Sequence, residues 1–296
     1  MNKGILYIIL SGFCFIIVNF FVKLLGAGNS QNIIEGLQKY PGHELVLARS
    51  IVSLAISLAV IKKRKIPVFG KNKKWLIIRG LSGTIALTIF FYTIHYLPLA
   101  IAATVQYLAP IFTIIIAMIL LKERVKLLQW LFIGVSFSGV ALIALNKISG
   151  IDSEPGGISF LWIGLGLISA VFSGLAYTAI IKLKSTDAPI TIVLYFPMIA
   201  TPIMILLCFY SFTMPQGIEW IILLLIGIFT QFAQILMTYA LHNGSASTIT
   251  PFQYLGAIYA FLLGYFVFDE TLSTVVNIGM CLVIGGVIVN VLIRKR

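Results

Sequence analysis

The sequence predicts an all-α membrane protein with ten transmembrane helices, built as two inverted five-helix repeats with both termini in the cytoplasm. Three observations lead to this fold class: the composition, the recurrence of long apolar segments, and a motif that occurs twice. Of the 296 residues, 60% are hydrophobic and only 10% are charged, and the mean hydropathy is +1.06. Soluble domains are about half apolar and about a quarter charged, so this chain is predicted to lie in lipid.

Apolar segments of about 20 residues, long enough to cross a hydrocarbon core as helices, follow one another along the chain. Short connections such as YLPLA and HNGSA favour antiparallel neighbours. The first segment is longer than a signal-peptide core and lacks an A-x-A cleavage site, so we interpret it as a retained helix. The predicted spans are 4–25, 43–61, 75–96, 99–121, 127–145, 157–181, 189–210, 217–241, 246–268 and 274–293.

The repeat is visible in the pattern Y-x-x-H, ten residues, Q-Y-L, which occupies Tyr92–Leu108 and again Tyr239–Leu255. The two copies are half a chain length apart, which indicates two related halves, 1–146 and 147–296. Because five spans per half is an odd number, the second half must enter the membrane from the opposite side. Inverted repeats of this kind are typical of secondary transporters.

The basic residues predict the orientation. Most of the 21 lysines and arginines fall in loops or tails on one side of the membrane, including the stretch KKRKIPVFGKNKK at 62–74. The positive-inside rule places that side, and both termini, in the cytoplasm. The same loops explain the net charge of +12 without a nucleic-acid partner. The three cysteines lie in different spans without metal-ligand spacing, so neither a metal site nor a cofactor is expected.

Two segments carry a resemblance to a known family. They are APIFTIIIAMILLKERV at 109–125 and GAIYAFLLGYFVFDETL at 256–272, each within a duplicated five-helix unit. Over nearly its whole length the chain resembles the EamA-type ten-helix transporters of the drug/metabolite transporter superfamily. It departs from them at Ala257, where a proline matching Pro110 is missing and Pro251 stands six residues earlier. The resemblance implies transport of small metabolites across the inner membrane, often outward, and the family includes exporters of amino acids and amphipathic compounds.

Polar residues inside the spans predict a chamber. Gln231, Gln234, Thr238 and His242 recur at i, i+3, i+7 and i+11, so one helix carries a polar stripe. Such residues either join helices through hydrogen bonds of about 0.6 kcal/mol or line a cavity. Together with the repeated Gln–Tyr motif, the stripe favours a cavity walled by amides and tyrosine rings. The predicted substrate-binding residues are Asn19, Tyr92, Gln106, Tyr107, Tyr177, Gln231, Gln234, Thr238, Tyr239, Gln253 and Tyr254.

Four residues at helix ends are candidates for gating or helix-end roles: His95, His242, Glu123 and Glu270. For the histidines, capping or gating and substrate contact are equally open. For the two glutamates, ion pairing or loop anchoring is the first expectation. Arg49 is expected to pair with Glu44 or to extend toward the membrane surface.

The absence of acidic residues from the span interiors, and of a nucleotide-binding motif, narrows the possible transport mechanisms. No Asp or Glu lies in the interior of a predicted span, and no Walker A motif occurs, which leaves facilitated diffusion or exchange. No paired carboxylates or catalytic dyad suggest an enzyme. The first prediction is an exporter of amino acids or related amphipathic metabolites that works by alternating access. The alternative is an antiporter of anionic metabolites, such as nucleotide sugars or sugar phosphates. It would need several cavity-facing Lys or Arg residues, and only Lys23, Arg49 and Arg79 are available.

Glycines in the spans 127–145 and 274–293 have few polar companions. Small residues let helix backbones approach closely in a membrane. These two helices are therefore predicted to form a scaffold or the surface of a homodimer.

Overall fold

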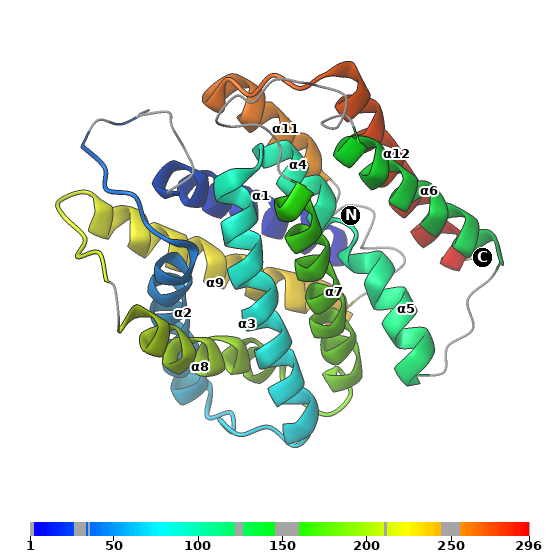
Figure 1. Ribbon diagram of the computed structural model, residues 1–296. Helices are drawn as coiled ribbons and strands as arrows, with labels where there is room; N and C mark the ends of the chain where they lie inside the picture. Colours follow the sequence, from blue (N-terminus) through cyan, green and yellow to red (C-terminus); the bar gives the residue numbers. More distant parts are fainter. Residues whose placement is uncertain are drawn as a thin grey trace.

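The computed structural model describes residues 3–26, 34, 36–121, 127–145, 160–209, 212–243 and 255–295, and in this part it is all-α (Figure 1). The prediction of an all-α membrane protein is confirmed. Seven of the described segments are long and apolar enough to cross a membrane, and three shorter apolar helices accompany them. The helices are α1 (Lys3–Leu25), α2 (Gly42–Arg64), α3 (Lys73–Tyr96), α4 (Leu99–Gln106), α5 (Ala109–Leu121), α6 (Leu127–Leu145), α7 (Phe160–Leu183), α8 (Pro189–Cys208), α9 (Glu219–Asn243), α11 (Leu255–Phe268) and α12 (Thr274–Lys295).

The predicted span 99–121 is divided into α4 and α5. The division lies at Tyr107 and Leu108, just before Pro110. Proline lacks an amide hydrogen and disfavours helical geometry in the residue before it, so an interruption here has a local cause. The backbone N–H of Tyr107 still bonds to the carbonyls of Ala103 and Thr104, which ends α4 tightly.

The two halves pack in a reciprocal way. Helix α3 of the first half packs along α7 of the second, and α9 of the second half packs along α1 of the first. Helix α2 pairs with its counterpart α8, and α6 pairs with its counterpart α12. Such an exchange of equivalent contacts is what a two-fold relation between the halves produces. Figure 1 shows α6 and α12 side by side at one edge of the bundle.

The glycines of α6 and α12 serve the contact between these two helices. A Cβ on Gly139 would come within 2.5 Å of the carbonyl oxygen of Gly279, and one on Gly286 would overlap the hydroxyl of Ser136. Ser136 in turn donates to the carbonyl of Val283 at 3.4 Å. The close approach therefore requires the missing side chains, as expected for membrane helices. It accounts for the predicted scaffold within a single chain.

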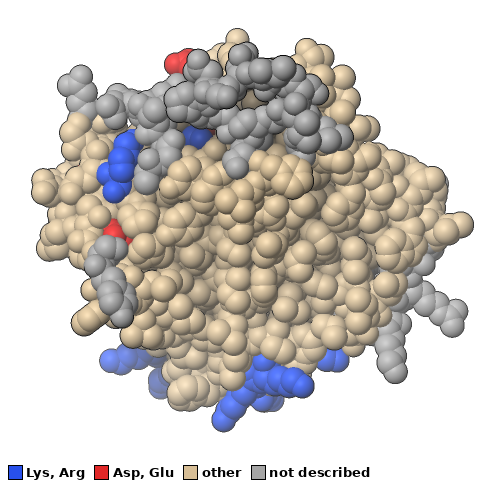
Figure 2. Space-filling view, in the orientation of Figure 1, with Lys and Arg blue, Asp and Glu red and all other residues tan. Residues whose placement is uncertain are grey.

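Charge is distributed unevenly over the surface. Figure 2 shows most of the visible lysines and arginines at the lower end of the molecule, with a few charged side chains at the upper left and a broad, largely uncharged band between them. The connection between α2 and α3 lies at this lower end in Figure 1, as does the connection between α7 and α8. Asp187 joins the two connections, because its carboxylate accepts from the backbone N–H groups of Lys71 and Asn72 at 2.6 and 3.3 Å. By the positive-inside rule this end faces the cytoplasm.

Candidate functional site

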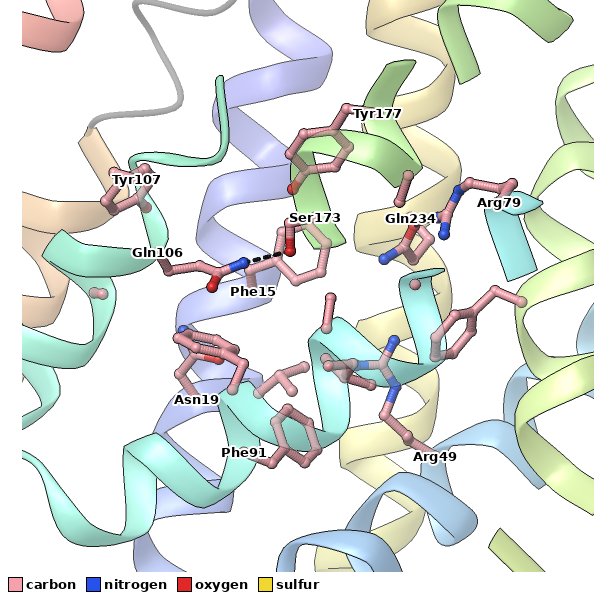
Figure 3. A pocket seen from close by; sticks show the side chains of 18 residues that line it. Phe15, Asn19, Arg49, Arg79, Phe91, Gln106, Tyr107, Ser173, Tyr177 and Gln234 are labelled. Carbon is pink, nitrogen blue, oxygen red and sulfur yellow. Dashed lines mark hydrogen bonds between the residues drawn. The ribbon is translucent and has the colours of Figure 1, made fainter. Parts of the chain in front are cut away.

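A central cavity of about 150 Å³ lies between helices of both repeats (Figure 3). Its walls combine aromatic rings, small residues, amides and two arginines, and its side chains come from α1, α2, α3, α4, α7, α8 and α9, with Tyr107 from the end of α4. Ligand pockets in bundles are typically of this kind, apolar with a few polar groups that fix orientation. The lining residues are Phe15, Val18, Asn19, Arg49, Arg79, Gly83, Ala86, Leu87, Phe90, Phe91, Ala103, Gln106, Tyr107, Ser173, Ala176, Tyr177, Phe196 and Gln234.

The two arginines are the unexpected part of this cavity. The side chains of Arg49 and Arg79 are only 1% and 3% exposed. Both guanidinium groups lie over the ring of Phe196, at 5.1 and 5.9 Å from its centroid, and Arg49 also lies 5.6 Å from the centroid of Phe91. Aromatic faces attract cations, so these rings hold the two charges in place. Figure 3 shows both groups pointing into the same space.

The expected partner of Arg49 is engaged elsewhere. The carboxylate of Glu44 accepts from the backbone N–H of Thr213, at 3.2 and 3.3 Å, and this ties the start of α2 to the connection between α8 and α9. The expectation that Arg49 pairs with Glu44 or extends outward is therefore wrong. Arg49 lies more than a turn farther into α2, on the buried face, where the aromatic rings of α3 and α8 replace the acid.

Arg79 is positioned by a glycine and an amide. Its Nη2 donates to Oε1 of Gln234 at 3.2 Å. A Cβ on Gly83, one turn later in α3, would overlap Nη1 of Arg79 and lie 3.0 Å from the ring of Phe196. The glycine therefore makes the room in which the guanidinium lies against its own helix.

The amide of Gln106 connects α4 to α7. Its Nε2 donates to the hydroxyl of Ser173 at 2.7 Å, and its Oε1 accepts from the hydroxyl of Ser169 at 3.0 Å. Figure 3 shows the Gln106–Ser173 bond at the edge of the cavity. Gln106 therefore fixes the wall that also carries Tyr107 and Tyr177.

The structure brings five of the predicted substrate-binding residues together in this cavity: Asn19, Gln106, Tyr107, Tyr177 and Gln234. Four others lie away from its walls. Gln231 donates to the hydroxyl of Ser57 at 2.8 Å and so joins α9 to α2, and Thr238 is buried. The hydroxyl of Tyr92 contacts Nδ1 of His43 at 2.7 Å.

Tyr239, the fourth of these, accepts from Nη1 of Arg64 at 3.2 Å and lines a smaller cavity of about 100 Å³. The remaining two predicted contacts, Gln253 and Tyr254, lie outside the described residues, as do Glu123 and the side chain of His242.

The two remaining helix-end candidates lie at the end of the molecule opposite the basic loops. Glu270 pairs with Nζ of Lys23 at 3.0 Å and accepts from the backbone N–H of Leu99 at 2.7 Å. Lys23 also donates to the carbonyl of Leu97 at 2.7 Å. This cluster joins the end of α1, the α3–α4 connection and the α11–α12 connection. His95 lies close by, with its buried ring packed against Gly26.

The sequence did contain a signal for the two arginines. Arg49 and Arg79 stand inside predicted spans, and charged residues at such positions normally face the interior and mark a pathway. The aromatic partner Phe196 gave no such signal, because phenylalanine is common throughout this chain.

The sequence matches the EamA-like transporter family over residues 2–145 and 160–292. The pseudopaline exporter CntI of Pseudomonas aeruginosa is 26% identical over 96% of this chain and 94% of its own length. A riboflavin transporter of Vibrio cholerae is 25% identical over 90% of this chain and 85% of its own. A crystal structure of a protein with 19% identity superposes with a TM-score of 0.63 over 97% of this chain and 98% of its own, which shows a shared fold.

Proposed function

The chain belongs to the EamA-like transporter family, and from this premise we propose that it exports amino acids or related amphipathic metabolites across the inner membrane. The cavity between the two repeats is the binding chamber in this proposal. Alternating access follows from the inverted repeats, because two related halves can exchange shapes around one central site.

The observation that carries this proposal is the division of the chamber walls. Amides and phenols, from Asn19, Gln234 and Tyr177, supply hydrogen bonds for the polar end of a solute. Phenylalanine rings such as Phe15 and Phe90 cover an apolar portion. A chamber with both kinds of wall suits an amphipathic solute better than a sugar or an ion.

A second candidate function is the exchange of anionic metabolites. The buried guanidinium groups of Arg49 and Arg79 favour it, since both line the chamber. Lys23, which the same hypothesis also requires, is paired with Glu270 and lies at the end of α1.

The test is uptake by the purified protein in liposomes, with a radiolabelled panel of aliphatic and aromatic amino acids. The variant Gln234→Leu changes the chamber wall, and Gln231→Leu is its matched control, because Gln231 lies one turn earlier on α9 and bonds to Ser57 instead. We expect saturable uptake that falls at least about tenfold in Gln234→Leu and less than about threefold in Gln231→Leu, as expected when only one of two amides contacts the solute. Equal losses in the two variants would remove the assignment of this chamber.

A further inference from the structure

The guanidinium groups in the chamber have hydrogen-bonding capacity that the protein does not use. Nε and Nη2 of Arg49 and Nε of Arg79 are buried and have no hydrogen-bond partner. In the part of the chain that the structure describes, neither arginine forms an ion pair. Each guanidinium carries a full positive charge and five N–H donors, so such a site is incomplete without an acceptor.

The acidic residues of the described segments lie away from the chamber. Glu44 and Asp187 accept backbone N–H groups of Thr213 and Lys71. Glu219 accepts from the hydroxyl of Tyr40 and from the backbone N–H of Gln216, and Glu270 pairs with Lys23. Asp269 stands next to Glu270, beyond the end of α11. None of these groups lines the chamber.

Two buried charges without a counter-charge are costly, and removing water from the chamber raises that cost. Aromatic faces compensate for only part of it. We propose that Arg49 and Arg79 form an oxyanion-binding site for the solute, whose carboxylate or phosphate group completes the site. This inference rests on the proposed function, because it names the chemical class of the solute that the same chamber carries.

The geometry of the site matches an oxyanion that presents two oxygens to one guanidinium. A guanidinium presents its donors as a rigid fork, which binds two oxygens of one carboxylate or phosphate at once. Arg49, on α2, offers Nε and Nη2 as such a fork, and Arg79, on α3, adds its Nε. The rings of Phe91 and Phe196 lie against the guanidinium groups, and Figure 3 shows both groups pointing into the chamber. The rest of the chamber remains for the apolar part of the solute.

The site also determines how the carrier returns. With the solute bound, both guanidinium groups have a counter-charge as the chamber closes and passes between its two open shapes. Without it, the closed shape holds two uncompensated charges, so the empty carrier crosses slowly. Transport is therefore an exchange, in which an anionic group occupies the chamber in both directions.

The first arm of the test measures binding and does not depend on transport. The full chain is purified in detergent, and its thermal unfolding is followed at constant ionic strength in sodium acetate, in inorganic phosphate, and in L-leucine compared with L-leucinamide, which lacks the carboxylate. We expect a saturable rise in the unfolding midpoint with the oxyanions and with leucine, and none with leucinamide. A larger effect of acetate than of phosphate assigns a carboxylate solute, and the reverse assigns a phosphate ester.

The variants make this arm specific. Arg49→Gln and Arg79→Gln should abolish the rise, and Arg64→Gln, at an exposed position on the same helix as Arg49, should retain it. If a glutamine variant does not fold, Arg49→Lys and Arg79→Lys serve instead, because lysine keeps the charge but loses the fork. These variants should raise the oxyanion concentration that half-saturates the stabilisation about tenfold or more. Stabilisation that persists in both glutamine variants, or that is absent from the wild type, would overturn the site.

The second arm measures exchange in liposomes. Uptake of labelled leucine should rise about tenfold or more when unlabelled leucine is loaded on the trans side, because loaded return avoids the empty carrier. In Arg49→Gln this dependence on trans-side loading should be lost. Binding without leucine flux would leave the oxyanion site standing and remove the amino-acid proposal. Leucine flux that is unchanged in both Arg49→Gln and Arg79→Gln would keep the amino-acid proposal and remove the oxyanion site.

Discussion

The cluster around Glu270 makes the sharpest prediction about gating. In Glu270→Gln the amide can still accept from the backbone N–H of Leu99, but the charge of Lys23 is left without its partner at 3.0 Å. The two side chains are only 9% and 11% exposed, so water compensates little. We therefore expect the conformation that is closed at the end of the molecule opposite the basic loops to lose stability relative to the conformation that is open at that end.

The magnitude follows from the burial. Removing one partner of a buried ion pair costs about 3–5 kcal/mol. Because Gln at 270 keeps the bond to Leu99 and Lys23 keeps its bond to the Leu97 carbonyl, the lower value, about 3 kcal/mol, applies. At 1.4 kcal/mol for each factor of ten, the ratio of open to closed shapes shifts roughly a hundredfold.

The assay is labelling of a single cysteine in the chamber. Ala103, a small residue of the chamber wall, is replaced by cysteine after Cys14, Cys208 and Cys281 have been removed, and right-side-out vesicles are treated with an impermeant maleimide. Labelling should be up to about a hundredfold faster in Glu270→Gln than in the parent, in proportion to the open population.

The control is the double variant Lys23→Met with Glu270→Gln. In this variant the cluster around position 270 has lost both charges of the ion pair, and replacing a buried pair by uncharged residues is often nearly neutral. Its labelling rate should therefore return to within a few-fold of the parent. An unchanged rate in the single variant, or a double variant as open as the single one, would refute the reasoning.

Two further predictions concern glycines, each with a matched control. Gly83→Ala places a methyl group against the guanidinium of Arg79, so substrate KM should rise and the free energy of unfolding should fall by about 1–3 kcal/mol. Its control is Gly134→Ala, at a position with open space around it, which should leave the unfolding midpoint unchanged or raise it. Gly286→Ala drives α6 and α12 apart and should also cost about 1–3 kcal/mol, whereas Gly285→Ala, its neighbour in open space, should gain up to about 1 kcal/mol. Equal midpoints for Gly285→Ala and Gly286→Ala would contradict the packing described between these helices.

The helices could be predicted from the sequence because their cause is local. A run of about 20 apolar residues must satisfy its own backbone in lipid, so length and composition are sufficient. The interruption before Pro110 was not predicted, although its cause is local too. The repeat was visible because the polar motif at its helix junction survives in both halves, at Tyr92 and Tyr239.

The chamber was only partly predictable because its cause is not local. Gln231 and Gln234 were assigned to one stripe, but three residues along a helix leave the two side chains about 60° apart. Whether one of them faces the chamber or a neighbouring helix depends on where α2 lies, and Ser57 of that helix binds Gln231. Arg49 was matched with the nearest acid in the sequence, whereas its partners come from α3 and α8.

The halves differ at the point where they meet. Counted from the matched starts of α2 at Gly42 and α8 at Pro189, Arg49 and Phe196 occupy equivalent positions, and they face each other across the contact between these two helices. A symmetric pair of arginines there would repel, and a symmetric pair of phenylalanines would leave Arg79 without a second cation in the chamber wall. Repeats that have diverged at this position instead pair a cation with the ring that supports it. Arg79 also comes from the first repeat, so the charge of the chamber belongs to one half only. One carrier therefore holds one oxyanion in one orientation, although its scaffold is built twice.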